Sequence, residues 1–185
     1  MKPFPFKHRT PIDLLNVDIQ GERVRLVSLA MDYDTDIFRE FTPEITRYMT
    51  PKSADKIEET HAFIQGSRAS MKEGHNLQLA ILLAETGEFL GCCGLHGREE
   101  MRKPELGIWL KKGAHGHGYG REAITTLVHW ANENLDLDSF IYPVDKANTA
   151  SRKIPESLGG KVVREVKVKA LTGHILDEVI YEIPV

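Results

Sequence analysis

Short apolar runs separated by polar or glycine-containing turns recur along this chain and predict β-strands, with apolar–polar alternation at 24–27. The runs 14–19 and 24–29 flank Gln20-Gly21-Glu22 and predict a first hairpin, while 77–84 and 89–95 flank Gly87 and predict a second. Glycine readily takes the backbone angles of a tight turn, which supports the turn at Gly87. Further strands are predicted at 104–110, 140–144, 162–169 and 175–183.

A second spacing, of three and four residues, predicts helices. It is clearest over 119–135, where the apolar face consists of Ala123, Ile124, Leu127, Val128, Ala131 and Leu135. A helix over 54–73 is expected to begin after Ser53, a residue type that often caps helices. Shorter helices are predicted at 34–41 and 148–158. The order of elements predicts one mixed α/β domain over 13–185, after an irregular arm over 1–12.

Composition excludes several classes of protein. The net charge is −3 and the pI is near 6.2, and Lys and Arg are scattered, which argues against a nucleic-acid-binding protein. No apolar run reaches the length of a signal peptide or of a membrane span, so we expect a cytoplasmic protein without a membrane partner. Cys92 and Cys93 are adjacent and would point to opposite faces of a strand. They are therefore expected to be core residues, and neither a metal pair nor a disulfide.

The connection between the strand at 104–110 and the helix at 119–135 carries glycine at every second position, Gly116, Gly118 and Gly120. Small residues at a helix start allow main-chain N–H groups to approach a bulky anion, because those N–H groups have no partner within the helix. We therefore predict a phosphate-binding turn. A dinucleotide-binding turn needs G-x-G-x-x-G and a P-loop needs G-x-x-x-x-G-K followed by Ser or Thr, and the sequence fits neither.

The six residues of this turn are His115, Gly116, His117, Gly118, Tyr119 and Gly120. They resemble the acetyl-CoA loop of the GNAT N-acetyltransferases, Q/R-x-x-G-x-G/A, with a histidine at the Gln/Arg position. Segments 107–110 and 118–123 resemble the branch that includes the RimJ and RimL types. The resemblance implies a three-layer α/β fold, with a mixed and mostly antiparallel sheet of about seven strands that is flanked by helices and splayed at the acetyl-CoA site. It also implies a short helix over 44–49.

The resemblance further implies acetyl-CoA (coenzyme A) as the cofactor, with its pantetheine arm between the strand before the loop and the strand after the loop's helix. A main-chain N–H near Leu110 would polarise the thioester carbonyl. The residues assigned to cofactor binding are Trp109, Leu110, Lys112, His115, Gly116, His117, Gly118, Tyr119, Gly120, Arg121, Asn148, Ser151 and Lys153. No metal site is expected, because no two histidines stand at ligand spacing with acidic support.

Amine acetylation needs a group that accepts the proton of the amine. Many members of the family carry an acidic residue at the start of the strand before the loop, and Glu105 stands there. A solvated glutamate at a strand end is the alternative reading. Glu99 and Glu100 are interpreted as solvated turn residues, and His75 and His96 as outside candidates for the base.

A second match to the family is the N-x-x-S segment at the start of the predicted helix 148–158. Asn148 would bond the pantetheine amides or simply cap its helix, and Ser151 would assist the leaving thiolate. Two positions depart from the family. Pro155 replaces a tyrosine that serves many relatives as general acid, and Gly160 replaces an aromatic residue.

These features predict an acetyl-CoA-dependent N-acetyltransferase in which the amine attacks the thioester directly, in a ternary complex. The resemblance alone suggests a protein N-terminal amine, such as that of a ribosomal protein, as the acceptor, and small amines stay open. The acceptor is expected between the helices at 34–49 and the C-terminal hairpin. A non-catalytic acyl-CoA-binding domain is the competing class. Both a monomer and a homodimer fit the sequence.

Overall fold

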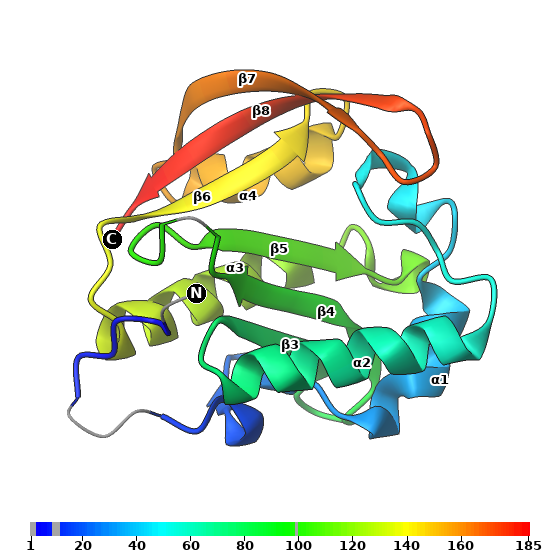
Figure 1. Ribbon diagram of the computed structural model, residues 1–185, viewed down its shortest axis with the longest axis horizontal. Coiled ribbons are helices and arrows are strands. Elements are labelled where there is room, and N and C mark those ends of the chain that lie inside the picture. The colour runs from blue at the N-terminus through cyan, green and yellow to red at the C-terminus, as the bar shows by residue number, and fades with distance from the viewer. Residues whose placement is uncertain (1–2, 9–11, 99) are drawn as a thin grey trace.

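A mixed β-sheet runs through the computed structural model, which describes residues 3–8, 12–98 and 100–185 (Figure 1). Within these residues the sheet has eight strands in the order β1-β2-β3-β4-β5-β6-β8-β7, and every neighbouring pair except β5 and β6 is antiparallel. The strands are β1 Asp18–Gln20, β2 Val24–Ser28, β3 Asn76–Leu83, β4 Phe89–His96, β5 Glu105–Leu110, β6 Ser139–Asp145, β7 Lys161–Lys169 and β8 Ile175–Pro184. The predicted fold class is confirmed, with eight strands where the resemblance implied about seven. The first predicted strand, 14–19, is instead the 3-10 turn Leu14–Asn16 followed by the short β1.

Helices cover both faces of the sheet. Figure 1 shows α2 in front of β3 and β4, and α3 and α4 behind the sheet. We call the two sides the α2 face and the α3 face. The helices are α1 Asp34–Glu40, α2 Ile57–Lys72, α3 Tyr119–Asn134 and α4 Thr149–Ser157, with 3-10 turns η1 Leu14–Asn16, η2 Met31–Tyr33, η3 Ile45–Tyr48 and η4 Lys112–Ala114. The short helix implied at 44–49 is thus the 3-10 turn η3.

The apolar face of α3 forms much of the core, as its spacing predicts. Ala123, Ile124, Leu127 and Ala131 have no exposed surface. Burying a large aliphatic side chain contributes about 1.5–3 kcal/mol, so this face fixes α3 firmly against the sheet. The N-terminus of α3, where the glycine turn lies, is therefore held in place by the core.

The start of α2 differs from the prediction. The helix begins at Ile57, with Lys56 at the cap position and no side-chain cap, so Ser53 does not cap it. Instead the Glu59 carboxylate accepts a bond from the Asp55 N–H at 3.3 Å, and two glutamates occupy the first turn. Acidic side chains favour a helix N-terminus through its partial positive charge, which explains why the helix starts later.

The two cysteines and parts of the N-terminal arm pack in or against the hydrophobic core. Cys92 and Cys93 are free and buried, as predicted, and burial raises the pKa of both thiols, which keeps them protonated. Phe4 is buried, and Phe6 forms an isolated bridge with Leu135. The division into an arm over 1–12 and a domain over 13–185 stays a prediction, and residues 1–2 and 9–11 of that arm lie outside the described residues.

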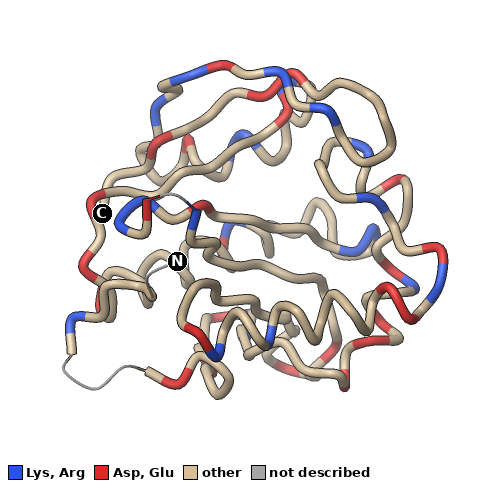
Figure 2. Tube along the Cα trace, in the orientation of Figure 1, with Lys and Arg blue, Asp and Glu red and all other residues tan. Residues whose placement is uncertain are grey.

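Charges of both signs are interspersed over the molecule (Figure 2). In the part of the chain that the structure describes, no helix is long and apolar enough to cross a bilayer. The same residues contain no group of three or more His, Cys, Asp or Glu side chains suited to hold a metal ion.

Candidate active site

The centre of the site is the divergence of β5 and β6. These parallel strands share one register pair, Glu105 with Ile141, and then separate (Figure 1). Main-chain groups of successive strand residues point to alternate sides. The Pro104 carbonyl accepts from the Ile141 N–H of β6, whereas the Lys111 N–H donates to the Leu90 carbonyl of β4. The even-numbered residues of β5 therefore direct their main chain toward β6. Leu110, rather than Trp109, therefore offers a main-chain donor at the gap.

The glycine turn lies at the wide end of this divergence. Gly116 and Gly118 have φ values of +81° and +80°, in the left-handed region that favours glycine, and Gly118 is the cap residue of α3. The two glycines bend the chain sharply just before α3, and residues 116–118 are exposed. No bond from the amide N–H groups of residues 116–121 to the protein occurs in the described structure. A row of free donors at a helix N-terminus is the chemistry that a diphosphate requires.

Gly120 serves a different purpose from its two neighbours. An added Cβ would lie 3.4 Å from Leu110 and 3.5 Å from Ile154, in a place where α3, β5 and α4 meet. The absence of a side chain lets the helix start pack close to both elements. The wide end of the β5–β6 gap is thus bordered by the start of α3 and by α4.

A clamp that the sequence patterns did not reveal holds the turn. Glu122, in the first turn of α3, accepts bonds from the main-chain N–H of Arg23 at 2.6 Å and from its side-chain Nε at 2.9 Å. The same guanidinium donates to the His117 carbonyl at 3.0 Å and lies over the Tyr119 ring. The β1–β2 hairpin therefore fixes the conformation of the turn from 94 residues away.

The ring of His115 forms a hydrogen bond within the protein. Its Nε2 lies 2.9 Å from the Leu110 carbonyl, so this nitrogen must carry the proton and donate. The bond fastens the turn to the end of β5. The exposed ring of His117 stacks on Tyr119 with 5.6 Å between centroids.

The remaining predicted cofactor residues fall into two groups. Lys112 is ion-paired with Glu44 of the segment before η3, and Trp109 packs its ring on Phe41 and Phe89 on the α2 face. Arg121 and Lys153 are exposed, with no ion pair among the described residues. These two cations stay available to an anionic ligand.

The N-terminus of α4 brings a pair of hydroxyls to the α3 face. Asn148 caps α4 and accepts from the Ser151 N–H at 3.3 Å, which leaves the amide NH₂ of Asn148 without a protein partner in the described structure. The Ser151 hydroxyl lies 2.8 Å from that of Tyr142 on β6. Burial raises the pKa of Tyr142 to about 12, so it keeps its proton at neutral pH. Sequence reasoning missed Tyr142, because an alternating apolar strand gives no sign of a partner on another element.

Glu105 lies at the closed end of the gap, on the α2 face. Its carboxylate is bound by Arg98 at 2.9 Å and its side chain is about a quarter exposed. His96 stands opposite it in the ladder, half-buried, and burial, together with the nearby Arg98, lowers the pKa of this histidine. Glu100 is exposed as predicted, and Glu99 lies outside the described residues.

Two further carboxylates of the α2 face were not predicted. Asp145 ends β6 and pairs in register with Glu178 of β8, and both are buried. Asp145 accepts bonds from the N–H groups of Ala147 and Asp177. Burial, followed by the negative charges of Glu105 and Asp145, raises the pKa of Glu178.

A family model described as "Acetyltransferase (GNAT) domain" matches residues 23–161. The chain belongs to the GNAT family. The predicted family is confirmed, and membership makes the protein an acyltransferase.

Individual relatives agree with this assignment. "Uncharacterized N-acetyltransferase p20" of Bacillus licheniformis is 28% identical over 140 residues, which cover 74% of this chain and 78% of that protein. "Putative ribosomal N-acetyltransferase YdaF" of Bacillus subtilis (strain 168) is 30% identical over 110 residues, 59% of this chain and 58% of that protein. The ribosomal L7/L12 alpha-N-protein acetyltransferase RimL, solved in complex with coenzyme A, superposes with a TM-score of 0.78 at 17% identity, covering 91% of this chain and 98% of that one. At this identity the likeness shows the fold alone.

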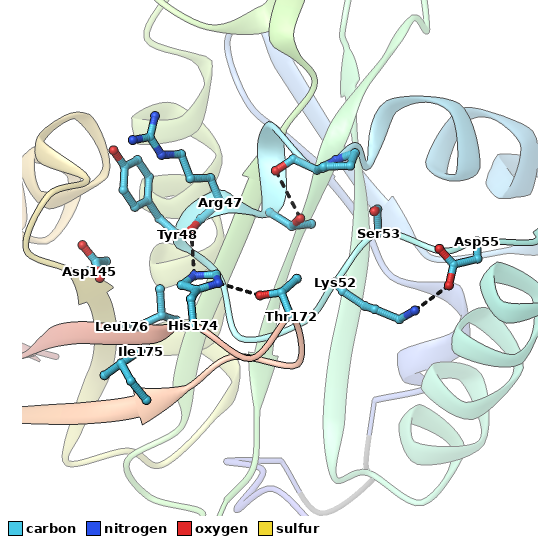
Figure 3. A pocket seen from close by; sticks show the side chains of 12 residues that line it. Arg47, Tyr48, Lys52, Ser53, Asp55, Asp145, Thr172, His174, Ile175 and Leu176 are labelled. Atoms are coloured by element: carbon cyan, nitrogen blue, oxygen red, sulfur yellow. Dashed lines mark hydrogen bonds and ion pairs between the residues drawn. The ribbon is translucent and has the colours of Figure 1, made fainter.

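This GNAT domain also has a pocket of about 720 Å³ on the α2 face, between η3 and the β7–β8 hairpin (Figure 3). The His174 ring closes one side by bonding the Arg47 carbonyl, and Asp145 is among the lining residues. The full lining is Pro43, Thr46, Arg47, Tyr48, Lys52, Ser53, Asp55, Asp145, Thr172, His174, Ile175 and Leu176. The pocket occupies the region in which the sequence placed the acceptor.

Proposed function

We propose that this GNAT protein is an acetyl-CoA-dependent N-acetyltransferase in which a primary amine attacks the thioester directly. The observation that carries the proposal is the row of free amides at 116–121, positioned at the wide end of the β5–β6 gap. A diphosphate fits those donors, and an extended amide-containing arm fits the unpaired main chain of β5. Acetyl-CoA, when bound there, would supply an activated acetyl group and a thiolate leaving group.

The residues proposed to hold the cofactor are those of the turn together with three polar side chains. The amides of 116–121 would bind the diphosphate, and Arg121 and Lys153 would add positive charge. The NH₂ group of Asn148 would donate to an amide carbonyl of the pantetheine arm. The Leu110 N–H would donate to the acetyl carbonyl and thereby stabilise the negative charge that develops on its oxygen.

Glu105 is proposed as the general base. Its carboxylate would take a proton from the amine, directly or through one water, and the freed lone pair would form the C–N bond as the C–S bond breaks. Arg98 keeps the carboxylate oriented toward the α2 face. On the opposite face the Ser151 hydroxyl, backed by the Tyr142 hydroxyl, would give a proton to the departing thiolate. This pair takes the place of the tyrosine that Pro155 replaces.

The proposed acceptor is the N-terminal amine of a protein, such as a ribosomal protein. Two relatives carry names that include ribosomal or alpha-N-protein acetyltransferase, and the pocket of about 720 Å³ has the volume to take the first residues of a peptide. The proposed location is the cytoplasm, where acetyl-CoA and ribosomes meet. Acetylation of a small amine is the second candidate, since the pocket also has the size of a small-molecule site.

The test is thiol release from acetyl-CoA against a panel of peptides with free N-termini, a polyamine and an aminoglycoside. We expect turnover with peptides. Glu105→Gln should lose turnover by about 100-fold or more while still binding coenzyme A, whereas the matched control Glu100→Gln, an exposed residue of the preceding turn, should keep both. Turnover of small amines alone would overturn the acceptor, and coenzyme A binding without any turnover would identify a non-catalytic binding domain.

A further inference from the structure

Glu178 is a buried carboxylate that the described structure leaves without a partner. Its residue is 8% exposed, and no hydrogen bond or ion pair of its side chain occurs among the described residues. Mostly buried carboxylates without donors are uncommon in folded proteins, because the charge has lost part of its water and gained no protein partner in return. Such a group calls for an explanation in terms of a ligand or a reaction.

The three carboxylates of this face differ in how they are satisfied. Asp145 has one main-chain N–H on each oxygen, at 2.8 and 3.0 Å, and Glu105 has the Arg98 guanidinium at 2.9 Å. Glu178 has neither. The charged groups that act on it are Glu105 from β5 and Asp145 from β6, and both are negative. Burial and these two charges raise its pKa, as a carboxylate without a cation requires.

Its position links the pocket to the proposed reaction centre. Alternation along β8 puts Glu178 on the face opposite to Tyr181, whose hydroxyl contacts Glu156 of α4 behind the sheet. On the α2 face, its register partner Asp145 lines the pocket. On its other side lies the charge of Glu105, at the start of the β5 edge. Glu178 therefore neighbours one carboxylate that lines the pocket and another at the start of β5.

We propose that the Glu178 carboxylate binds the ammonium group of the acceptor before the proton is removed. An ammonium group brings three N–H donors and one positive charge, which would satisfy the carboxylate and offset its two negative neighbours. An α-amino group has a pKa of about 7.7–8.0 and is mostly protonated at pH 7, so this residue would capture the dominant form of a peptide N-terminus. The inference rests on the proposed acetyltransferase function and adds the substrate class, a cationic amine.

Proton and charge balance hold in this scheme. Glu178 stays a carboxylate throughout and holds the –NH₃⁺ group, from which Glu105 takes one proton to leave a neutral amine. The amine forms the new C–N bond, the C–S bond breaks, and the second amine proton ends on the sulfur of coenzyme A. The proton on Glu105 passes to solvent, so each turnover releases one proton.

The experiment compares Glu178→Gln with Glu182→Gln, a glutamate on the same face of the same strand that is bound by Ser139 and Lys103. With the best peptide from the thiol-release panel, Glu178→Gln should raise KM for the peptide at least about tenfold, with a smaller change in kcat and unchanged coenzyme A affinity. Glu182→Gln should keep the wild-type KM. An unchanged KM in Glu178→Gln, or a loss confined to kcat, would overturn the inference.

A binding measurement on the wild-type enzyme removes any dependence on the folding of a variant. With coenzyme A bound, calorimetry compares the peptide with a free N-terminus and its N-acetylated form, which carries no ammonium group. We expect the free form to bind at least about tenfold more tightly in the wild type, and the two forms to bind alike in Glu178→Gln. Equal affinity in the wild type would overturn this inference alone, whereas absence of turnover with every amine would overturn the proposed function.

Discussion

The two sides of the proposed reaction centre are built in different ways. On the cofactor side, consecutive residues of one turn present main-chain amides, and the Arg23–Glu122 clamp fixes their conformation. On the acceptor side, Glu105, Asp145 and Glu178 come from three strands, and each side chain has a different set of partners. The cofactor side therefore depends on backbone geometry, which tolerates side-chain changes. The acceptor side depends on individual side chains, where one substitution alters specificity.

The largest expected effect comes from Gly118→Asp on the cofactor side. Aspartate at this position would have to adopt a φ of +80°, which non-glycine residues rarely do, and it would place a negative charge where the diphosphate is proposed to bind. We expect coenzyme A affinity to fall by about 100-fold or more, which corresponds to roughly 2.7 kcal/mol. Calorimetric titration measures it. The control Gly113→Asp adds the same side chain in the same connection, in open space and without positive φ, and should bind normally.

A smaller effect is expected when the hydroxyl behind Ser151 is removed. Tyr142→Phe deletes the 2.8 Å contact and leaves the buried ring in place. We expect kcat to fall by about tenfold, equivalent to roughly 1.4 kcal/mol, with coenzyme A affinity unchanged. Because the pKa of Tyr142 is raised to about 12, the kcat profile of the wild type should show no break from this group between pH 6 and 9. If Tyr142→Phe keeps the wild-type kcat, the hydroxyl contact between Ser151 and Tyr142 takes no part in the mechanism.

Loosening the clamp should weaken cofactor binding without abolishing it. Arg23→Ala removes the bond to the His117 carbonyl and one bond to Glu122, while the main-chain bonds to Glu122 stay. We expect coenzyme A affinity to fall by about three- to tenfold, or roughly 0.7–1.4 kcal/mol. The control is Arg25→Ala, which breaks the exposed ion pair between β2 and Asp18 of the neighbouring strand β1. This variant should bind coenzyme A as the wild type does. Equal loss in both variants would mean that the hairpin as a whole, and not the clamp, matters.

The smallest effect concerns stability on the acceptor side. The pKa of Glu178 is raised in the folded state, so folding is penalised at neutral pH, and the penalty disappears as the pH falls below the ordinary glutamate value. Glu178→Gln should therefore raise Tm at pH 7 by about 2–4 °C, the shift that roughly 1 kcal/mol produces in a protein of this size. The gain should vanish near pH 4.

Glu182 provides a control of opposite sign. Ser139 and Lys103 lower its pKa, so its ionised form contributes stability at neutral pH that is lost as the pH falls through the lowered pKa. Glu182→Gln should lower Tm at pH 7. Thermal unfolding monitored by circular dichroism at pH 7 and pH 4 compares both variants, and a lower Tm for Glu178→Gln at pH 7 would contradict the described environment of that carboxylate.

The sequence predicted the fold well, because periodicity is a local signal. The α3 face and the hairpin at Gly87 both follow from residues close together in the chain. The predicted start of α2 was wrong because the Glu59 carboxylate accepts a bond from the Asp55 N–H, a contact that competes with the Ser53 cap.

The candidate site shows the same contrast between features set by neighbouring residues and features set by distant ones. The glycine turn and the Asn148 cap are contiguous motifs and could be predicted. Glu178 and Tyr142 could not, since each acquires its surroundings from strands that are distant in sequence. The bond from His115 to Leu110 was also beyond prediction, because it depends on how the turn folds back on β5.

The most direct test of the central claim is amide hydrogen exchange of residues 116–121 with and without coenzyme A. These amides have no partner in the protein, so they should exchange rapidly in the free enzyme. Addition of coenzyme A should slow their exchange by about tenfold or more, while amides of the β7–β8 hairpin stay unchanged. Exchange at 116–121 that is equally fast with saturating coenzyme A would contradict the account.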